Sequence, residues 1–203
     1  VSAISKDEVK TSDQSFSADL VISSLDASLT NALLTGKKPE VAPNRSCSGV
    51  AIYAALKQPL PEGTVTHSVV MPDDPADLYR ALKSNSAPEQ TMSFVNYYEP
   101  GSVYANSKAT VAVLFTAPAD SADYDLETTW VRDEIDRVSN LIGLDRPIDQ
   151  LFEDYKILNA NYFESFGALG GALYGAKNPL WQSGPFHNPS YRSLRRPWLY
   201  RVG

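Results

Sequence analysis

The sequence predicts an α+β fold in which a mixed, largely antiparallel β-sheet is covered by helices. Runs with strand character occur in adjacent pairs as well as alternating with helical segments, which disfavours a doubly wound parallel sheet. The chain has 203 residues, of which 43% are hydrophobic and 21% charged, and such values are typical of a globular protein. No apolar run approaches the roughly 20 residues that span a bilayer.

The first 36 residues predict short strands followed by one helix. Strands are expected at 1–4, 14–16 and 18–23, with polar turns at 6–8 and 11–13. The run 18–23 is apolar enough to suggest a strand buried on both faces. Residues 24–28 offer several N-cap candidates, a helix is expected from Leu29 to Leu34, and Gly36 should end it.

The central part predicts four strands and one helix. Residues 48–56 and 64–71 are strongly β-prone, and the proline-containing turn at 59–63 suggests that these two strands lie side by side. A helix is expected at 73–85, where Leu78, Tyr79 and Leu82 can share one face. Two more strands are expected at 92–97 and 110–116.

The segment 126–142 has the clearest amphipathic pattern in the chain. Its expected buried face carries Trp130, Ile135, Val138 and Ile142, and its expected solvent face carries Arg132, Asp133, Asp136 and Arg137. A shorter helix is expected at 148–155, after Pro147. The chain then becomes rich in glycine and, beyond residue 179, in proline, which predicts an extended loop before a last strand at 198–202.

Composition excludes several classes of function. The net charge of −6 argues against a dedicated nucleic-acid binder, which needs a basic surface. The single cysteine, Cys47, permits no internal disulfide. Together with only two histidines, His67 and His187, it provides no recognisable set of metal ligands. We therefore expect no metal site. The sequence also does not pair a nucleophile with a base, so the catalytic residues stay unassigned.

Two glycine-containing segments are candidates for a ligand site. Residues 167–175 have the spacing G-x-x-G-G-x-x-x-G, which matches neither a dinucleotide fingerprint nor a Walker loop. They form either a tightly packed turn or one wall of a flat apolar site. The following segment places Gln182, Phe186 and His187 in one loop, which either lines a pocket or is ordinary surface.

Several stretches together resemble the phytoene desaturase-like family of FAD-dependent oxidoreductases. The first comprises Val1-x-x-Ile4 and the segment 17–26, which ends in Val-Ile-Ser-Ser-Leu-Asp. The second is Ser-Cys-Ser-Gly-Val at 46–50. The third comprises Gly-Gly-Ala-Leu-Tyr-Gly at 170–175, Gln-Ser-Gly-Pro-Phe at 182–186 and Leu-Tyr-Arg-Val-Gly at 199–203. The order and spacing of these stretches support the resemblance. Together the stretches extend over nearly the whole chain.

The chain departs from the family pattern at three places. Ser24 stands where the family commonly has Asn, and Phe186-His187-Asn188-Pro189 stands where Phe-Arg-Pro is common. The N-terminal dinucleotide-binding fold with its glycine fingerprint is absent from the sequence. We therefore expect the chain to be a C-terminal fragment that is inactive in isolation and binds FAD weakly or not at all.

The resemblance implies that different parts of the chain belong to different domains. Residues 1–36 and 181–203 would belong to the FAD-binding domain, and residues 37–180 would form the substrate-binding domain. The expected cofactor-side residues are Val1, Ser23, Ser24, Asp26 and Gly203, and the expected substrate-side residues are Tyr174, Gly175, Gln182, Phe186 and His187. The cofactor would be FAD, and the substrate an apolar polyene or isoprenoid from which hydride passes to flavin.

Two alternatives remain open at this stage. The chain could be a non-catalytic binding module for an apolar ligand or a protein partner. It could also belong to another flavoprotein of the amine-oxidase type, such as a relative of protoporphyrinogen oxidase. We expect a cytoplasmic location, with peripheral attachment to a membrane surface as an open alternative, and no nucleic-acid partner.

Overall fold

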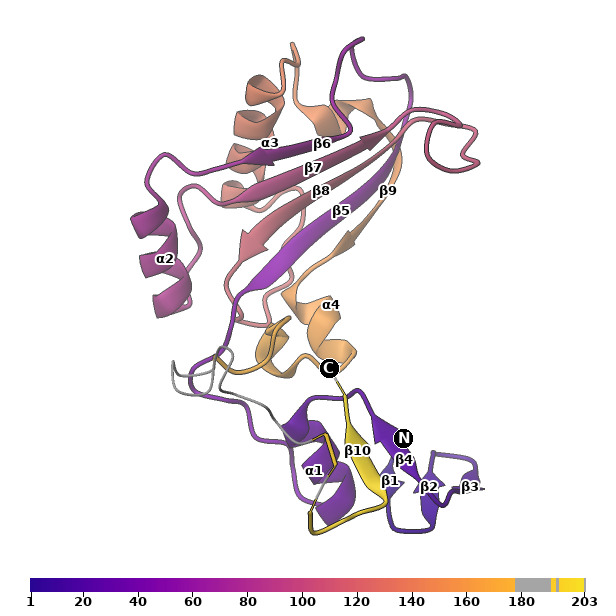
Figure 1. Ribbon diagram of the computed structural model, residues 1–203. Coiled ribbons are helices and arrows are strands. Elements are labelled where there is room, and N and C mark those ends of the chain that lie inside the picture. The colour runs from indigo at the N-terminus through magenta and orange to yellow at the C-terminus, as the bar shows by residue number, and fades with distance from the viewer. Residues whose placement is uncertain (178–190, 193, 203) are drawn as a thin grey trace. The chain divides into compact units, whose positions relative to one another are not determined.

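The computed structural model describes residues 1–177, 191–192 and 194–202, and the chain divides into two compact units. One unit contains residues 1–45, 167–169 and the part of the chain from 175 onward, and the other contains residues 46–166 and 170–174. We call them the terminal unit and the sheet unit. Each is described by itself (Figure 1).

The sheet unit is built on a five-stranded antiparallel sheet with the order β6-β7-β8-β5-β9. The strands are β5 (Ser48–Leu56), β6 (His67–Val70), β7 (Ser93–Tyr98), β8 (Thr110–Ala117) and β9 (Phe152–Leu158). The helices of the chain are α1 (Ala27–Thr35), α2 (Pro75–Ser84), α3 (Thr129–Leu141) and α4 (Ala160–Ser165), with short 3₁₀ turns η1 (Ile148–Leu151) and η2 (Leu169–Gly171). The predicted α+β class with largely antiparallel strands is therefore confirmed.

The expected pairing of the first two long strands was wrong. β5 pairs with β8 and β9, while β6 pairs with β7 at the edge of the sheet, so β7 and β8 lie between β5 and β6. β5 and β8 are the most apolar strands, and they take inner positions in the sheet, where most of their residues are buried. The connection of residues 57–66 is long enough to cross the intervening strands.

Helix α3 supplies the core on one face of the sheet. Trp130, Val131, Ile135 and Val138 are buried, and they belong to the same core as the inward row of β5, which includes Val50 and Ile52. The predicted apolar stripe is confirmed, with Ile142 only partly buried beside it. Tyr97 also belongs to this core. Its hydroxyl oxygen accepts a hydrogen bond from the Leu60 N–H at 3.2 Å, and burial raises the pKa of the hydroxyl.

The expected helix at 148–155 was also wrong. Only η1 is helical there, and the chain continues as β9 along β5, with Ile52 opposite Ile157 and Ala54 opposite Tyr155. Six residues of β9 pair with β5, and Phe, Tyr and Ile are better suited to a strand than to a helix. The tertiary partner therefore outweighs the weak local helical signal.

Helix α2 agrees with its predicted position and has well-defined ends. The Asp74 carboxylate accepts a hydrogen bond from the Ala76 N–H at 2.8 Å at its start, and Asn85 ends it in the left-handed conformation. None of its residues is fully buried. In the described part of the chain, no helix is long and apolar enough to cross a membrane.

The terminal unit contains a small antiparallel sheet of β1 (Ala3–Ile4), β2 (Glu8–Lys10) and β3 (Ser15–Ser17), and a parallel pair of β4 (Val21–Ser23) and β10 (Leu199–Arg201). Glu8 begins β2 rather than ending a turn. The run 18–23 is not buried on both faces, because the Ile22 side chain is 64% exposed. Among the described residues this parallel sheet has two strands. Gly36 ends α1 in the left-handed conformation, as expected.

The expected boundaries at residues 36 and 180 differ in detail from those of the compact units. The terminal unit continues to residue 45 and resumes within 167–169 and after 174. Its two chain ends are joined through the β4–β10 pair. The assignment of these end segments to an FAD-binding domain stays a prediction.

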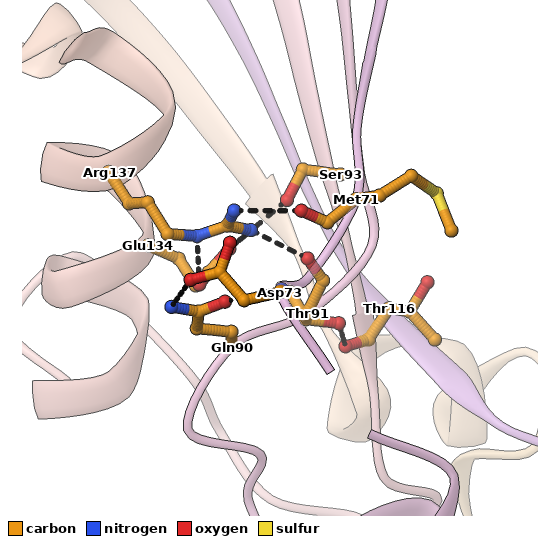
Figure 2. Close-up of polar contacts among 8 residues, drawn as sticks. All are labelled: Met71, Asp73, Gln90, Thr91, Ser93, Thr116, Glu134 and Arg137. Carbon is orange, nitrogen blue, oxygen red and sulfur yellow. Dashed lines mark hydrogen bonds and ion pairs between the residues drawn. The ribbon is translucent and has the colours of Figure 1, made fainter. Parts of the chain in front are cut away.

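A buried ion pair fastens α3 to the ends of the segment that carries α2 (Figure 2). The Glu134 side chain is 1% exposed, and its carboxylate accepts hydrogen bonds from Arg137 Nε and Nη2, each at 2.8 Å, and from the Ser93 hydroxyl at 3.2 Å. Arg137 also donates to the carbonyl oxygens of Met71 (3.0 Å) and Thr91 (2.8 Å). One guanidinium therefore holds both ends of the excursion 72–90.

A second contact closes the same excursion near its base. The Gln90 amide oxygen accepts from the Asp73 N–H at 2.8 Å, and the Gln90 amide nitrogen donates to the Asp73 carboxylate at 3.0 Å. These bonds align the residues on either side of α2. The position of α2 thus depends on its polar base more than on apolar burial.

We predict that Arg137→Met lowers the free energy of unfolding by about 3–5 kcal/mol, because it leaves the Glu134 carboxylate buried without its cation. The double variant Glu134→Leu/Arg137→Met should lose clearly less, since neither charge remains. Urea denaturation measures both values.

Arg80→Met is the matched control for this experiment. Arg80 is paired with Asp77 on the exposed surface of α2, so its loss should cost at most about 1 kcal/mol. A double variant no more stable than Arg137→Met alone would show that the buried charge is not the cause.

Candidate functional site

The strongest candidate site lies on the face of the sheet opposite α3. Side chains alternate along each strand, so Tyr53 and Ala55 of β5 point away from the α3 core, as do Ala112 of β8 and Asn96 of β7. The register places Tyr53 opposite Ala112, and Ala112 opposite Asn96. In Figure 1 no helix lies in front of β7, β8 and β5 on this side. We call this surface the open face.

The open face contains a groove of about 540 Å³. Small and aliphatic side chains form its floor, namely Ala55, Ala112 and Leu114, and three tyrosines stand around it, namely Tyr53, Tyr98 and Tyr104. Gly and Ala leave room above a sheet, while tyrosine rings supply large apolar contact area with a polar tip. The groove therefore suits a flat or elongated apolar ligand.

Contacts among the side chains hold one wall of the groove in place. The rings of Tyr98 and Tyr104 meet edge to face with centroids 5.5 Å apart, and the Tyr104 hydroxyl is hydrogen-bonded to that of Thr110. The His67 ring packs on Tyr98 at 6.0 Å, and His67 Nδ1 is hydrogen-bonded to Asn96 Oδ1 at 2.7 Å. The aromatic wall is thus ordered before any ligand arrives.

The polar groups of the groove do not form a catalytic set. Asp154 and Lys156 lie at the β9 side, and the Lys156 ammonium stands 5.6 Å from the Tyr162 ring centroid. Within the described residues, no group of three or more His, Cys, Asp or Glu side chains could hold a metal ion. The arrangement can bind and orient a ligand, and it offers no paired nucleophile and base.

Three of the five predicted cofactor-side residues lie together in the terminal unit. Val1, Ser23 and Ser24 line a groove of about 380 Å³ whose other lining residues, such as Leu20 and Ile22, are mostly apolar. The Ser23 hydroxyl is buried and bonded to that of Thr30 at 2.8 Å. Its role in the structure is therefore to join β4 to α1.

Asp26 has a different place from the one expected. It caps α1, where its carboxylate accepts a hydrogen bond from the Ser28 N–H at 2.7 Å, and it does not line the groove of Val1, Ser23 and Ser24. A carboxylate at this helix start satisfies the N–H groups that would otherwise attract a phosphate. Gly203 lies outside the described residues.

The predicted substrate-side residues are only partly covered. The Tyr174 side chain is 78% exposed, and its backbone N–H donates to the Ser46 hydroxyl at 3.0 Å. It does not line the groove of the open face. Gly175 adopts a positive φ of 64°, and a Cβ there would meet an Asp26 carboxylate oxygen at 3.1 Å. Gln182, Phe186 and His187 lie outside the described residues.

Sequence reasoning missed the tyrosines of the open face. Tyr53 interrupts the apolar run of β5 on alternate positions with Ala51 and Ala55, and this alternation was the available signal. The groove, however, also needs residues from β7, β8 and β9. Without the strand order, no reading of single segments could bring them together.

No protein-family model matches the sequence, and a search of curated proteins finds no significant match.

We predict that the open face binds a neutral apolar dye such as Nile red, and that Tyr53→Ser weakens this binding about tenfold by removing one aromatic wall. Fluorescence titration measures the affinity. Tyr79→Ser is the matched control, because Tyr79 is exposed on α2 and does not line the groove. Equal losses for both variants would place the dye elsewhere.

Proposed function

We propose that this chain is the substrate-binding region of an FAD-dependent oxidoreductase resembling phytoene and carotenoid desaturases. The observation that carries the proposal is the uncovered face of the antiparallel sheet, with its groove of tyrosines above small side chains. The resemblance of the segments 1–4, 17–26, 46–50, 170–175, 182–186 and 199–203 to that family supports the same assignment.

A polyene is the class of substrate that best suits this surface. It is long, flat and apolar, and it requires orientation rather than a nucleophile from the protein. In a desaturation, the flavin accepts a hydride from the substrate and a proton is lost to water or a base. The residues of this chain would hold the hydrocarbon, with Tyr53 and Tyr98 packing against it and Ala112 allowing close approach to the sheet.

The terminal unit supports the proposal that the ends of this chain belong to an FAD-binding domain. A parallel pair of short strands is not a stable sheet by itself, yet β4 and β10 form such a pair with Ile22 largely exposed. Further strands beside them would extend the sheet, and helices packed on that sheet would cover Ile22. An FAD-binding domain contains such a sheet, and this would account for Val1 and Ser24 lying beside the uncovered strands.

The described residues do not by themselves fit a complete FAD site. The groove beside Val1 and Ser24 is apolar and carries no cation, and the start of α1 is occupied by the Asp26 carboxylate. A dinucleotide site needs glycine-rich backbone and a helix N-terminus that is free to receive pyrophosphate. We therefore expect the described residues to contact the flavin and not the adenosine or pyrophosphate of FAD.

The second candidate is a non-catalytic module that binds an apolar ligand or a protein partner. It is favoured by the lack of a paired nucleophile and base in the described groove. A relative of protoporphyrinogen oxidase is a further variant of the flavoprotein proposal, and it would differ in accepting a macrocycle rather than a chain. The shape of the ligand that the groove binds distinguishes these candidate functions.

We expect this chain to bind FAD only weakly, because the adenosine and pyrophosphate sites are missing from it. Titration of FAD with the chain should leave flavin fluorescence nearly unquenched up to high micromolar concentration. Quenching with micromolar affinity would contradict the assignment of the cofactor site to another domain.

We also expect detergent-solubilised phytoene to displace Nile red from the chain, and to do so about tenfold less well from Tyr53→Ser. A porphyrin of similar apolar area serves as the comparison ligand. Displacement by the porphyrin alone would favour the protoporphyrinogen oxidase variant. Displacement by neither would favour the protein-binding module.

A further inference from the structure

The groove of the open face ends at two charged side chains on β9. The register places Asp154 opposite Ala55 and Lys156 opposite Tyr53, and residues directly opposite each other point to the same face of a sheet. Both charged side chains therefore lie on the open face, and both line the groove. Residues two apart in a strand are separated by about 7 Å, so one carboxylate and one ammonium flank the same end of the groove.

Neither charge is neutralised within the described part of the chain. Asp154 and Lys156 have no hydrogen bond or ion pair there, not even with each other, and the Lys156 ammonium instead lies 5.6 Å from the centroid of the Tyr162 ring. That ring packs on Phe166, with centroids 4.9 Å apart. An ammonium on an aromatic ring keeps N–H donors for a further partner. This end of the groove therefore offers an acceptor and a donor side by side.

The polar groups at the β7 end of the groove differ, because they are bonded to one another. The Asn96 amide oxygen is hydrogen-bonded to His67 Nδ1 at 2.7 Å, and the hydroxyls of Tyr104 and Thr110 share a hydrogen bond. A polar ligand group at this end would have to displace an existing bond. The β7 end and the floor at Ala112 thus favour the apolar part of a ligand, and the β9 end favours a polar part.

We propose that the groove binds an apolar chain that carries a hydroxyl group at one end, with this hydroxyl between Asp154 and Lys156. A hydroxyl both donates and accepts hydrogen bonds, so it can donate to the carboxylate and accept from the ammonium at the same time. The inference rests on the proposed function, and it narrows the substrate class of the groove from apolar chains in general to isoprenoid alcohols.

The two opposite charges disfavour other end groups. A carboxylate would be attracted by Lys156 and repelled by Asp154, and an ammonium would meet the reverse. A hydrocarbon end would displace water from both side chains without replacing its hydrogen bonds. The net charge of −6 further disfavours an anionic ligand. A neutral group that donates and accepts is the one that suits both side chains.

Displacement of Nile red by a matched set of linear isoprenoids tests the end group. Farnesol, farnesoic acid, farnesylamine and farnesene have closely similar chains and end in a hydroxyl, a carboxylate, an ammonium and a hydrocarbon. Asp154 and Lys156 are exposed, so water competes for their hydrogen bonds. We expect the full 203-residue chain to bind farnesol about tenfold more tightly than farnesene, and also more tightly than the acid and the amine.

Variants of the two charged residues assign the preference. Lys156→Met keeps an unbranched apolar side chain but removes the ammonium, and it should reduce the preference for farnesol over farnesene to about threefold or less. Asp154→Asn removes the negative charge and should strengthen the binding of farnesoic acid. Lys83→Met is the matched control, because Lys83 is exposed on α2 and does not line the groove, so it should leave the preference unchanged.

The outcomes separate this inference from the proposed function. Equal binding of farnesol and farnesene by the parent chain would overturn the inference while leaving a groove for apolar chains, and so would tighter binding of the acid or the amine. A full preference for farnesol in Lys156→Met, shown to be folded by circular dichroism, would also overturn it. Failure of every isoprenoid to displace the dye would contradict the proposed function itself, and the inference with it.

Discussion

The sheet unit depends on the packing of α3 against one face of the five-stranded sheet. Trp130, Ile135 and Val138 fill the space above β5 and β8, and apolar burial of this kind is the main stabilising contribution to such a layer. The buried Glu134–Arg137 pair then sets where the neighbouring segments begin and end. Among the described residues of the sheet unit, this core lies on one face of the sheet, and Tyr53 and Phe94 on the open face are exposed.

That asymmetry links the fold to the proposed binding role. An antiparallel sheet can stand with one face exposed to water, and polar side chains normally cover such a face. Here the open face presents tyrosines around Ala112 and Leu114 instead, which is more apolar surface than solubility requires. We therefore propose an apolar ligand for this groove, and the resemblance to carotenoid desaturases suggests one class of ligand.

The terminal unit also supports the proposed function, through its strand pairing and independently of the groove. Its β4–β10 pair brings both ends of the described chain together, and it leaves Ile22 exposed. β4 and β10 lie far apart in the sequence, and each contributes one strand to this sheet. The small size of this sheet, rather than any single residue, is what favours a larger domain around it.

The sequence by itself determined α1, α2, α3 and most strands, because their signals are local. Asp74 and Asn85 mark the ends of α2, Gly36 ends α1, and the spacing of Trp130, Ile135 and Val138 identifies the inner face of α3. Such features depend only on neighbouring residues, through capping and helical periodicity.

Only the tertiary structure decided the order of the strands, the strand conformation of residues 152–158, and the groove. Strand pairing joins residues far apart in the chain, and several orders satisfy the same local pattern. The residues that form the groove, including Tyr53, Asn96 and Tyr155, become neighbours only when β7, β8, β5 and β9 take their places. The expected site residues near the C-terminus came from resemblance, whereas the open face came from the packing of one helix on one side of the sheet.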